Sequence, residues 1–393
     1  MTARSCDVVI VGAGPAGSAL AKDCRERGLE VLLVDPRGDE KWHSTYGTWV
    51  DDLEDRDDAE ALKETLRISW PTVRVVGSRE HWLPRAYGFF DNDRLRSYLR
   101  TTPLHLSSVQ EVVRDRESDG LVVRCLDGER ITARVVVDAG GSRSSLLARH
   151  RHHEGGVQSA FGIVTRNSPR AYRDCFTLMD WSVAHRDPTF LYTVDFGDGS
   201  VLLEETSLYR TRPVDEQTLE RRLVERIGGD VSREGIEHVE IPMGWGVPSF
   251  SRLVVGFGAA AGFVHPVTGY SVAASLRATH RVSGALQRVI SDGLSTDERV
   301  QRVWGAVWPA ELRRTRSLHQ YGLASLRRFD GHDLQEFFDT FFSLPTEEWS
   351  AYLRIDTPPR TIAKVMTRFF ARMSWSLRGK VMTANPWSLF GGH

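Results

Sequence analysis

The chain has 393 residues, of which 41% are hydrophobic and 26% are charged, and this composition excludes an intrinsically disordered protein. Its 51 basic and 52 acidic residues leave a net charge of −1, which excludes the basic body typical of nucleic-acid-binding proteins. The four cysteines (Cys6, Cys24, Cys125 and Cys175) are too widely separated for a zinc motif, so we expect no metal site and a reducing, cytoplasmic compartment.

Apolar runs give no sign of a targeting or membrane-spanning segment. The first run, residues 7–11, begins too early and is too short for the core of a signal peptide. The longest, residues 253–264, is too short to span a bilayer. We therefore expect neither a signal peptide nor a transmembrane helix.

The N-terminal part carries a dinucleotide-binding pattern. A buried strand is predicted at 7–11, a helix at 18–27 and a second strand at 31–34, which is followed by Asp35. The first strand and the helix are joined by Gly12, Ala13, Gly14, Pro15, Ala16 and Gly17. Glycines let the backbone approach a pyrophosphate, the helix N-terminus supplies free N–H groups, and Asp35 can accept from ribose hydroxyls. The spacing predicts a dinucleotide site; the alternative is a glycine turn in an ordinary βαβ unit.

Two later segments repeat the pattern of an apolar strand that runs into small residues. Residues 135–145 include Asp138 and Gly140, and residues 253–270 lead into a predicted helix. Candidate cofactor-binding residues of the last segment are Gly258, His265, Pro266, Gly269 and Tyr270. For His265, a satisfied core histidine is an equally good interpretation.

Three such segments exceed what a simple NAD domain uses, and they resemble the discontinuous FAD domain of flavoproteins similar to glutathione reductase and the aromatic hydroxylases. One departure from the hydroxylases is Phe257, which stands where they carry Asp. The resemblance implies that the last helix points its N-terminus at the flavin pyrimidine ring, where a positive helix end would favour an anionic, reduced flavin.

We therefore expect an α/β protein: a Rossmann-like FAD-binding domain of the glutathione-reductase and aromatic-hydroxylase type, a β-rich substrate domain and a helical C-terminal cap. Residues 1–155 would form the first part of the FAD domain, with an inserted segment at 46–90. Residues 156–249 would form the substrate domain, 250–290 the return segment of the FAD domain, and 291–393 the helical region.

Motifs along nearly the whole chain are similar to those of the plant and actinobacterial lycopene cyclases. They are STYGTWVDDLE at 44–54, YGFFDNDRL at 87–95, QSAFG at 158–162, MDW at 179–181, PTFLY at 188–192, LEET at 203–206, IPMG at 241–244 and GFGAAAGFVHPVTGYS at 256–271. Small departures occur at Leu202, where the family usually has Phe, at Ser182, where it usually has Arg, and at Val247, where a glycine is commoner.

The resemblance implies an enzyme that binds FAD, needs it reduced with NAD(P)H as reductant, and closes the acyclic ends of lycopene to β-rings without net redox change. Glu204 of the LEET motif would be the acid or the counter-charge of the cation, and a dry pocket with a nearby carboxylate would keep it protonated. The alternatives are a flavin monooxygenase or polyene reductase, a cyclase of another terpenoid polyene, and a non-enzymatic polyene-binding flavoprotein.

The two glutamates of this motif fall on opposite faces of a predicted strand at 201–208. Side chains alternate along a strand, so Glu204 shares a face with Leu202 and Thr206, while Glu205 points to the other side. Unless a bulge intervenes, only one of the two can enter a given cavity, and the other has a structural role. Without the resemblance, such a pair is more often a solvated strand edge.

Other acids are weaker catalytic candidates. Asp51 and Glu54 belong to an acidic run at 51–60, which is typical of a solvated loop or helix start. Asp180 follows the strand that leads into Trp181. We keep Asp51, Glu54 and Asp180 as alternatives should Glu204 not be the acid.

Residues 360–380 predict a basic amphipathic helix. Arg360, Lys364, Arg368 and Arg372 fall on one side, and six basic residues occur in this segment without an acid. Ile362, Val365, Met366, Phe369, Phe370 and Met373 fall on the other side. Such a helix can lie on an anionic membrane, where a polyene dissolves; the alternative is a last helix docked on the body. Other carotenoid enzymes are possible partners, and nucleic acid is not expected.

Overall fold

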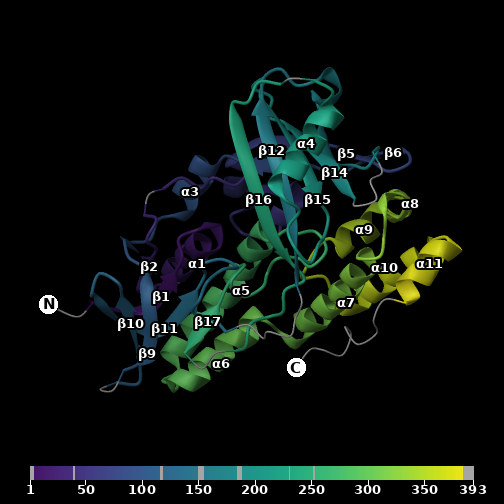
Figure 1. The fold of residues 1–393 in the computed structure, drawn as a ribbon. Coiled ribbons are helices and arrows are strands. Elements are labelled where there is room, and N and C mark those ends of the chain that lie inside the picture. Colours follow the sequence, from purple (N-terminus) through teal and green to yellow (C-terminus); the bar gives the residue numbers. More distant parts are fainter. Residues whose placement is uncertain are drawn as a thin grey trace.

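In the computed structural model, the strands of the described residues form three sheets (Figure 1). The structure describes residues 4–383 except 39, 116–117, 149–154, 184–187, 230 and 251–252. Two seven-stranded sheets lie apart from each other, and the long helix α5 (Val272–Ser291) runs between them (Figure 1). Residues 384–393 of the predicted helical region lie outside the described residues.

The first sheet has the order β8-β2-β1-β11-β10-β9, with β17 beside β11. Its strands are β1 (Arg4–Val11), β2 (Val31–Val34), β8 (Leu104–His105), β9 (Val109–Arg114), β10 (Leu121–Cys125), β11 (Arg130–Asp138) and β17 (Val254–Gly256). β1 is parallel to β2 and β11, and β11 is parallel to β17. The apolar centres of these strands share one core with α1 (Pro15–Glu26) and α5, as a strand buried on both faces requires. The predicted Rossmann-like α/β architecture is confirmed.

The second sheet has the order β16-β12-β15-β14-β13-β5-β6. Its strands are β5 (Val73–Val76), β6 (Glu80–Leu83), β12 (Gly156–Thr165), β13 (Phe176–Asp180), β14 (Thr189–Asp195), β15 (Val201–Ser207) and β16 (Gly235–Met243), with the short helix η2 (Arg170–Tyr172) before β13. One face packs under α4 (Glu216–Ile227), where Leu203 joins the core. The other face, which includes Leu202, packs toward the C-terminal helices.

The segment at 46–90 contributes to two sheets. β3 (Gly47–Trp49), β4 (Leu66–Trp70) and β7 (Tyr87–Phe90) form a three-stranded sheet, whereas β5 and β6 extend the second sheet through β13. The short helices η1 (Val50–Leu53) and α2 (Ala59–Glu64) lie within the segment, and α3 (Asn92–Leu99) follows it. The segment thereby connects the three-stranded sheet to the second sheet.

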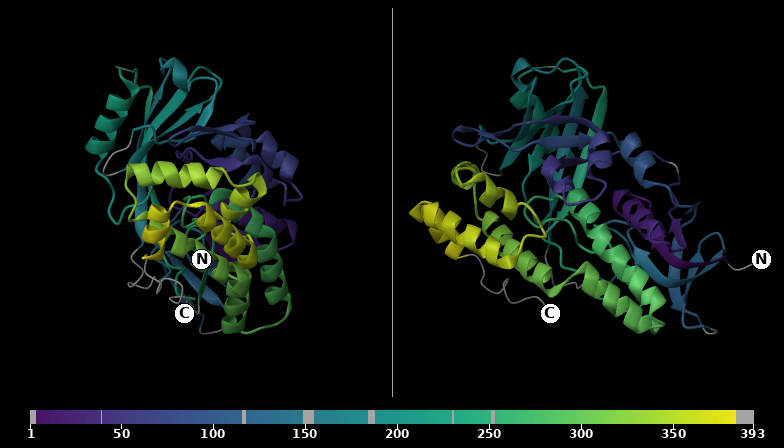
Figure 2. Two further views of the ribbon diagram at one scale, coloured as in Figure 1. Left: turned by 90° about the vertical axis from the view of Figure 1, so that its right-hand side faces the viewer. Right: turned by 180° about the vertical axis from the view of Figure 1, so that it is seen from behind.

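The chain after α5 is helical, as predicted. The helices are α6 (Thr296–Val307), α7 (Ala310–Leu326), α8 (Gly331–Phe342), α9 (Thr346–Tyr352), α10 (Pro359–Arg372) and α11 (Trp375–Met382). Helices α8 to α11 gather on one side of the molecule (Figure 2). No helix in the described part of the chain is long and apolar enough to cross a bilayer.

The predicted amphipathic helix is present as α10, but its apolar side faces the protein. Ile362, Val365 and Phe369 are buried, and the Phe369 ring lies 4.8 Å from Phe337 and 5.3 Å from Phe341. The interpretation that this apolar face enters a membrane is therefore wrong, because the face is already occupied by the core. The docked helix, which was the alternative, is the observed arrangement.

Candidate active site

Glycines bring the three predicted nucleotide segments together at the start of α1. A Cβ on Gly12, whose φ is +102°, would lie 2.6 Å from the carbonyl oxygen of Ala139. A Cβ on Gly17 would lie 2.0 Å from the carbonyl oxygen of Gly12, and one on Gly258 would lie 2.6 Å from the Cβ of Ala16. A side chain fits at none of these contacts, so the three segments meet in one small region.

Asp35 stands at the end of β2 and faces the glycine turn. Its Oδ2 accepts a hydrogen bond from the N–H of Ala13 at 2.8 Å, and its Oδ1 accepts one from the N–H of Arg37 at 2.8 Å. Arg100, at the end of α3, donates to the carbonyl oxygens of Ala13 at 3.0 Å and Gly38 at 2.8 Å. Sequence reasoning missed Arg100, because a single arginine after a helix gives no signal of its own.

Asp138 orders the turn of the second segment. The residue is fully buried at the end of β11, and its Oδ1 accepts a hydrogen bond from the N–H of Gly140 at 2.9 Å. Its carbonyl oxygen accepts one from the N–H of Phe257 at 2.8 Å, which joins this turn to the third segment. Asp138 therefore stabilises the turn, and it lies next to the predicted cofactor site.

The start of α1 fits the pyrophosphate of a dinucleotide. A Cβ on Gly14 would have no heavy atom within 4 Å, so the backbone borders open space at this point. The helix has no side-chain cap and no acidic residue in its first turn, so no acid of that turn repels an anion at the positive end of the helix. The residues present can thus hold a dinucleotide such as FAD.

The third segment contains a turn organised by His265 and including Pro266. The N–H of His265 donates to the carbonyl oxygen of Tyr270 at 2.8 Å, and Nδ1 accepts from the N–H groups of Val267 and Thr268, each at 3.2 Å. Burial holds the pKa of His265 well below its ordinary value, so the ring is neutral. Nδ1 of His265 is therefore satisfied within the turn, whereas Nε2 is buried without a hydrogen-bond partner among the described residues, so contact of this histidine with the cofactor stays a prediction.

Gly269 and Tyr270 place the end of this turn against the second sheet. Gly269 has a φ of +76°, and a Cβ there would lie 3.0 Å from Ile241 on β16 and 3.2 Å from Gln158 on β12. The Tyr270 ring lies 6.1 Å from that of Tyr87. Since α5 begins two residues later without an acidic residue in its first turn, its positive end lies beside the second sheet.

Glu204 lies on β15, on the face of the second sheet that is turned toward this region. The residue is 8% exposed, and Thr206 donates a hydrogen bond to Oε1 at 2.9 Å. Tyr192 on β14 is directly opposite Glu204, and the charges acting on Tyr192 come from Glu204 and Tyr270 as well as Glu237. Burial, together with the charge of Glu237, raises the pKa of Glu204 to about 8. The side chain is therefore a protonated acid at neutral pH.

The second carboxyl of this face belongs to Glu237, which no sequence motif indicated. Gly162 on the intervening strand β12 is in register with Glu204 on β15 and with Glu237 on β16. Directly opposed residues of paired strands share a face, so both carboxyls lie on one face with a glycine between them. The alternation of β16 was visible in the sequence, but this register was not.

Glu205 lies on the opposite face, under α4. Arg226 donates to its carboxylate through Nε at 2.8 Å and through a terminal nitrogen at 3.0 Å, and Thr189 donates to it at 2.5 Å. The side chain has no exposure to solvent. The pairing of β15 with its two neighbours contains no bulge, so the predicted alternation is confirmed. The structure does not bring the candidate Glu205 to the Glu204 face; it forms a buried ion pair instead.

The acidic candidates of the 51–60 run are engaged elsewhere. Asp51 is half exposed and pairs with Arg85 at 2.9 Å, and Glu54 is exposed beside Lys63 at 3.5 Å. Their neighbour Asp52 is buried and accepts a hydrogen bond from Arg85 at 3.0 Å. Burial raises the pKa of Asp52, while Arg277, Arg85 and Arg354 lower it. This group is an ionic network that joins the 46–90 segment to the C-terminal helices.

Asp180 belongs to the α4 side of the second sheet. It pairs in register with Leu191, whose side chain joins the core under α4, and its Oδ1 accepts a hydrogen bond from the N–H of Ser182 at 2.8 Å. Its charge acts on Tyr172, which packs against the same core. The structure therefore does not bring Asp180 and Glu204 together.

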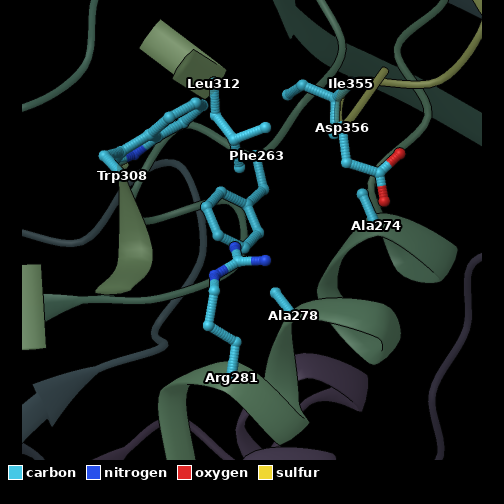
Figure 3. A pocket seen from close by; sticks show the side chains of 8 residues that line it. All are labelled: Phe263, Ala274, Ala278, Arg281, Trp308, Leu312, Ile355 and Asp356. Carbon is cyan, nitrogen blue, oxygen red and sulfur yellow. The ribbon is translucent and has the colours of Figure 1, made fainter. Parts of the chain in front are cut away.

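A small pocket lies between α5, α7 and the chain before α10 (Figure 3). Phe263, Arg281, Trp308 and Asp356 are among the residues that line it, and none of its lining residues is a predicted site residue. The pocket is thus separate from the Glu204 face.

Comparison with protein families gives a match over almost the entire chain. The model of the family described as "Lycopene cyclase protein" matches residues 7–378. A chloroplastic lycopene beta cyclase of Arabidopsis thaliana is 35% identical over 376 residues, which cover 88% of this chain and 74% of that protein. A lycopene beta cyclase of Synechococcus elongatus is 31% identical over 96% of this chain and 95% of its own length. A chloroplastic neoxanthin synthase of Solanum lycopersicum is 30% identical over 97% of this chain and 80% of that protein.

Solved structures share the fold at low identity. A geranylgeranyl bacteriochlorophyll reductase-like protein of Thermoplasma acidophilum has a TM-score of 0.71 at 15% identity, covering 96% of this chain and 99% of that one. A flavin-dependent brominase has a TM-score of 0.64 at 16% identity, covering 94% of this chain and all of that one. The predicted flavoprotein fold is therefore confirmed, and the chain belongs to the lycopene cyclase family.

Proposed function

We propose that this protein is an FAD-dependent lycopene β-cyclase that starts ring closure by protonating the acyclic end of its polyene. The observation that carries this proposal is the Glu204 carboxyl: it is buried, and its pKa is raised to about 8, so it holds a proton at neutral pH. Protonation of an alkene requires an acid in an apolar, water-poor environment. Membership of the lycopene cyclase family supplies the class of substrate.

In the proposed reaction, Glu204 transfers its proton to C2 of the acyclic end. The C5=C6 double bond then closes onto C1, and the ring cation at C5 loses a proton from C6 to give the β-ring. One C–H bond forms and one breaks, so no electrons are consumed. Tyr192 lies directly opposite Glu204 on the neighbouring strand, and its ring could face a cation without trapping it.

The cofactor would be held by the turn at Gly12–Gly17 together with Asp35, beside the positive ends of α1 and α5. When bound and reduced, FAD would supply negative charge that stabilises the cation, and NAD(P)H would keep it reduced. We also propose contact with a membrane surface, since the substrate class dissolves in bilayers. Trp375 is 84% exposed, and Arg360 and Lys364 are exposed on the neighbouring helix α10.

The activity is tested by expressing the protein in cells that accumulate lycopene and separating the pigments by chromatography. We expect β-ring products, which should disappear with Glu204→Gln. The purified, reduced enzyme should form rings while consuming far less than one NADPH per ring. Consumption of one NADPH per product, with a saturated polyene as the product, would favour a reductase instead.

Cofactor binding is tested separately with Gly14→Val. Because a Cβ on Gly14 would have no heavy atom within 4 Å, the variant should fold, and it should lose FAD because the new side chain occupies the space of the pyrophosphate. Gly305→Val, at an exposed glycine of α6 that also has free space, is the matched control. A Gly14→Val protein that retains its flavin would contradict the assignment of the site.

A further inference from the structure

Glu237 occupies an unusual position relative to Glu204. Three strands are involved: β15 carries Glu204, β16 carries Glu237, and β12 lies between them with Gly162 in register with both. Adjacent strands are roughly 4.8 Å apart, so two glutamates separated by one strand can approach each other only across the middle residue. A Cβ on Gly162 would lie 3.0 Å from Cδ1 of Leu202 and 3.5 Å from the Cβ and the Cγ of Glu204, so the side chains of β15 pack closely over this glycine. Because Gly162 has no side chain, β12 itself places none between the two carboxyls.

The Glu237 carboxylate is held in place by one residue. The N–H of Thr45 donates to Oε1 at 2.9 Å, and the hydroxyl of Thr45 donates to Oε2 at 2.6 Å. Each oxygen thus accepts a hydrogen bond, as a carboxylate anion does. Among the described residues, no lysine, arginine or histidine is within ion-pair distance of Glu237. Thr45 precedes β3, so these two hydrogen bonds also join the second sheet to the start of the three-stranded sheet.

Among the described residues, no positively charged group acts on Glu204. Tyr192 lies opposite on β14, Thr206 donates from the same strand, and Tyr270, in the turn before α5, acts on Tyr192. Burial raises the pKa of both tyrosines, so they are neutral near pH 7. The charge of Glu237 is consequently the one that acts on Glu204, alongside burial.

We propose that Glu237 is a positioning residue for the reaction: its carboxylate, fixed by Thr45 and facing Glu204 across Gly162, keeps the acidic proton on Glu204 until the polyene takes it. This assignment rests on the proposed function, since it gives the acid of that reaction a partner. After transfer, two negative charges face each other across Gly162. Their repulsion favours return of the proton released from C6 to Glu204, which restores the acid without any other reactant.

The test is the pH dependence of lycopene conversion by the reduced, FAD-loaded enzyme. Activity of the parent should fall as the pH rises through the pKa of Glu204, near 8. In Glu237→Gln this alkaline limb should move down by about one pH unit, while the rate at low pH stays near that of the parent. Glu237→Asp keeps the charge, so its alkaline limb should lie close to that of the parent. Glu240→Gln is the control, because Glu240 lies on the other face of the same strand and pairs with Arg143.

A second measurement does not depend on the substrate. Infrared spectroscopy of the FAD-loaded protein should show a protonated carboxyl that is absent from Glu204→Gln and that deprotonates at lower pH in Glu237→Gln. If Glu237→Gln loses its flavin or fold, Glu237→Ala removes the same charge and serves in its place. Identical midpoints in parent and charge-removed variant, in both measurements, would overturn the inference. A further outcome is that the parent protein fails to convert lycopene while the infrared midpoint of Glu204 is still lower in Glu237→Gln than in the parent. That result would contradict the proposed function but not the interaction of the two carboxyls.

Discussion

The two faces of the second sheet each carry one glutamate of the same strand, and their surroundings are opposite. On the α4 face, Glu205 is fully buried and bonded to Arg226 and Thr189, so its charge is balanced. On the other face, Glu204 is buried beside Thr206 and Tyr192, the charge of Glu237 acts on it, and no cation among the described residues forms an ion pair with it. Burial alone does not decide whether a carboxyl is a structural anion or a proton donor; the sign of the nearest charge does.

This comparison predicts its largest effect for Glu204→Gln. The variant should keep its fold and FAD but lose ring formation by ~10²–10⁴ in rate, because an amide cannot donate the proton. Conversion of lycopene by anaerobically reduced enzyme measures the effect. Glu205→Gln, assayed per flavin-loaded molecule, is the control. Normal cyclisation by Glu204→Gln would place the acid elsewhere.

On the α4 face, substitution of the glutamate should lower the stability of the fold instead of the cyclisation rate. Glu205→Gln leaves the charge of Arg226 buried without a balancing anion, which should lower the free energy of unfolding by about 3 kcal/mol. Denaturant unfolding measures this loss. The double variant Glu205→Met with Arg226→Met removes both charges and should recover much of it. Equal and complete loss of cyclisation from Glu204→Gln and Glu205→Gln would break the distinction between the faces.

The raised pKa of Glu204 also predicts a pH dependence of stability. Between its ordinary value of 4.5 and about 8, Glu204 holds a proton in the folded protein but not in the unfolded chain. Unfolding then releases a proton, so this contribution is present at low pH and is lost as the pH rises through 8, at up to about 1.4 kcal/mol per pH unit. Comparing parent with Glu204→Gln by denaturant unfolding between pH 5 and pH 9 isolates this slope. If the difference in free energy of unfolding between parent and Glu204→Gln stays constant across that range, the raised pKa of Glu204 is contradicted.

The smallest effects are expected for acids that belong neither to the Glu205–Arg226 ion pair nor to the face that carries Glu204 and Glu237. Asp51→Asn removes one half-exposed partner of Arg85, which retains Asp52, so stability should change by less than about 1 kcal/mol. The cyclisation rate should stay within about twofold of the parent. Both quantities come from the assays above, with Glu204→Gln as the reference for a true catalytic loss. A large drop in rate would return Asp51 to the catalytic candidates.

The first sheet and its glycine turn were largely predictable because their determinants are local. The contact of Gly12 with Gly17, the turn toward Asp35 and the strand at 7–11 all follow from residues close together in the chain. The alternation of Glu204 and Glu205 was predictable for the same reason, since the period of a strand is set by its backbone. The motif series also indicated the family that the comparison then confirmed.

The contacts of the buried glutamates depend on the tertiary fold. Local sequence patterns were sufficient to predict that Glu204 and Glu205 point to opposite faces, and that residues 360–372 form an amphipathic helix. The fold brings Arg226 to Glu205 and places Glu237 on the same face as Glu204. It also packs Phe369 of α10 into the core. The register of β12 with β15 and β16 joins residues far apart in sequence, and it depends on how whole sheets pack, which no local pattern encodes.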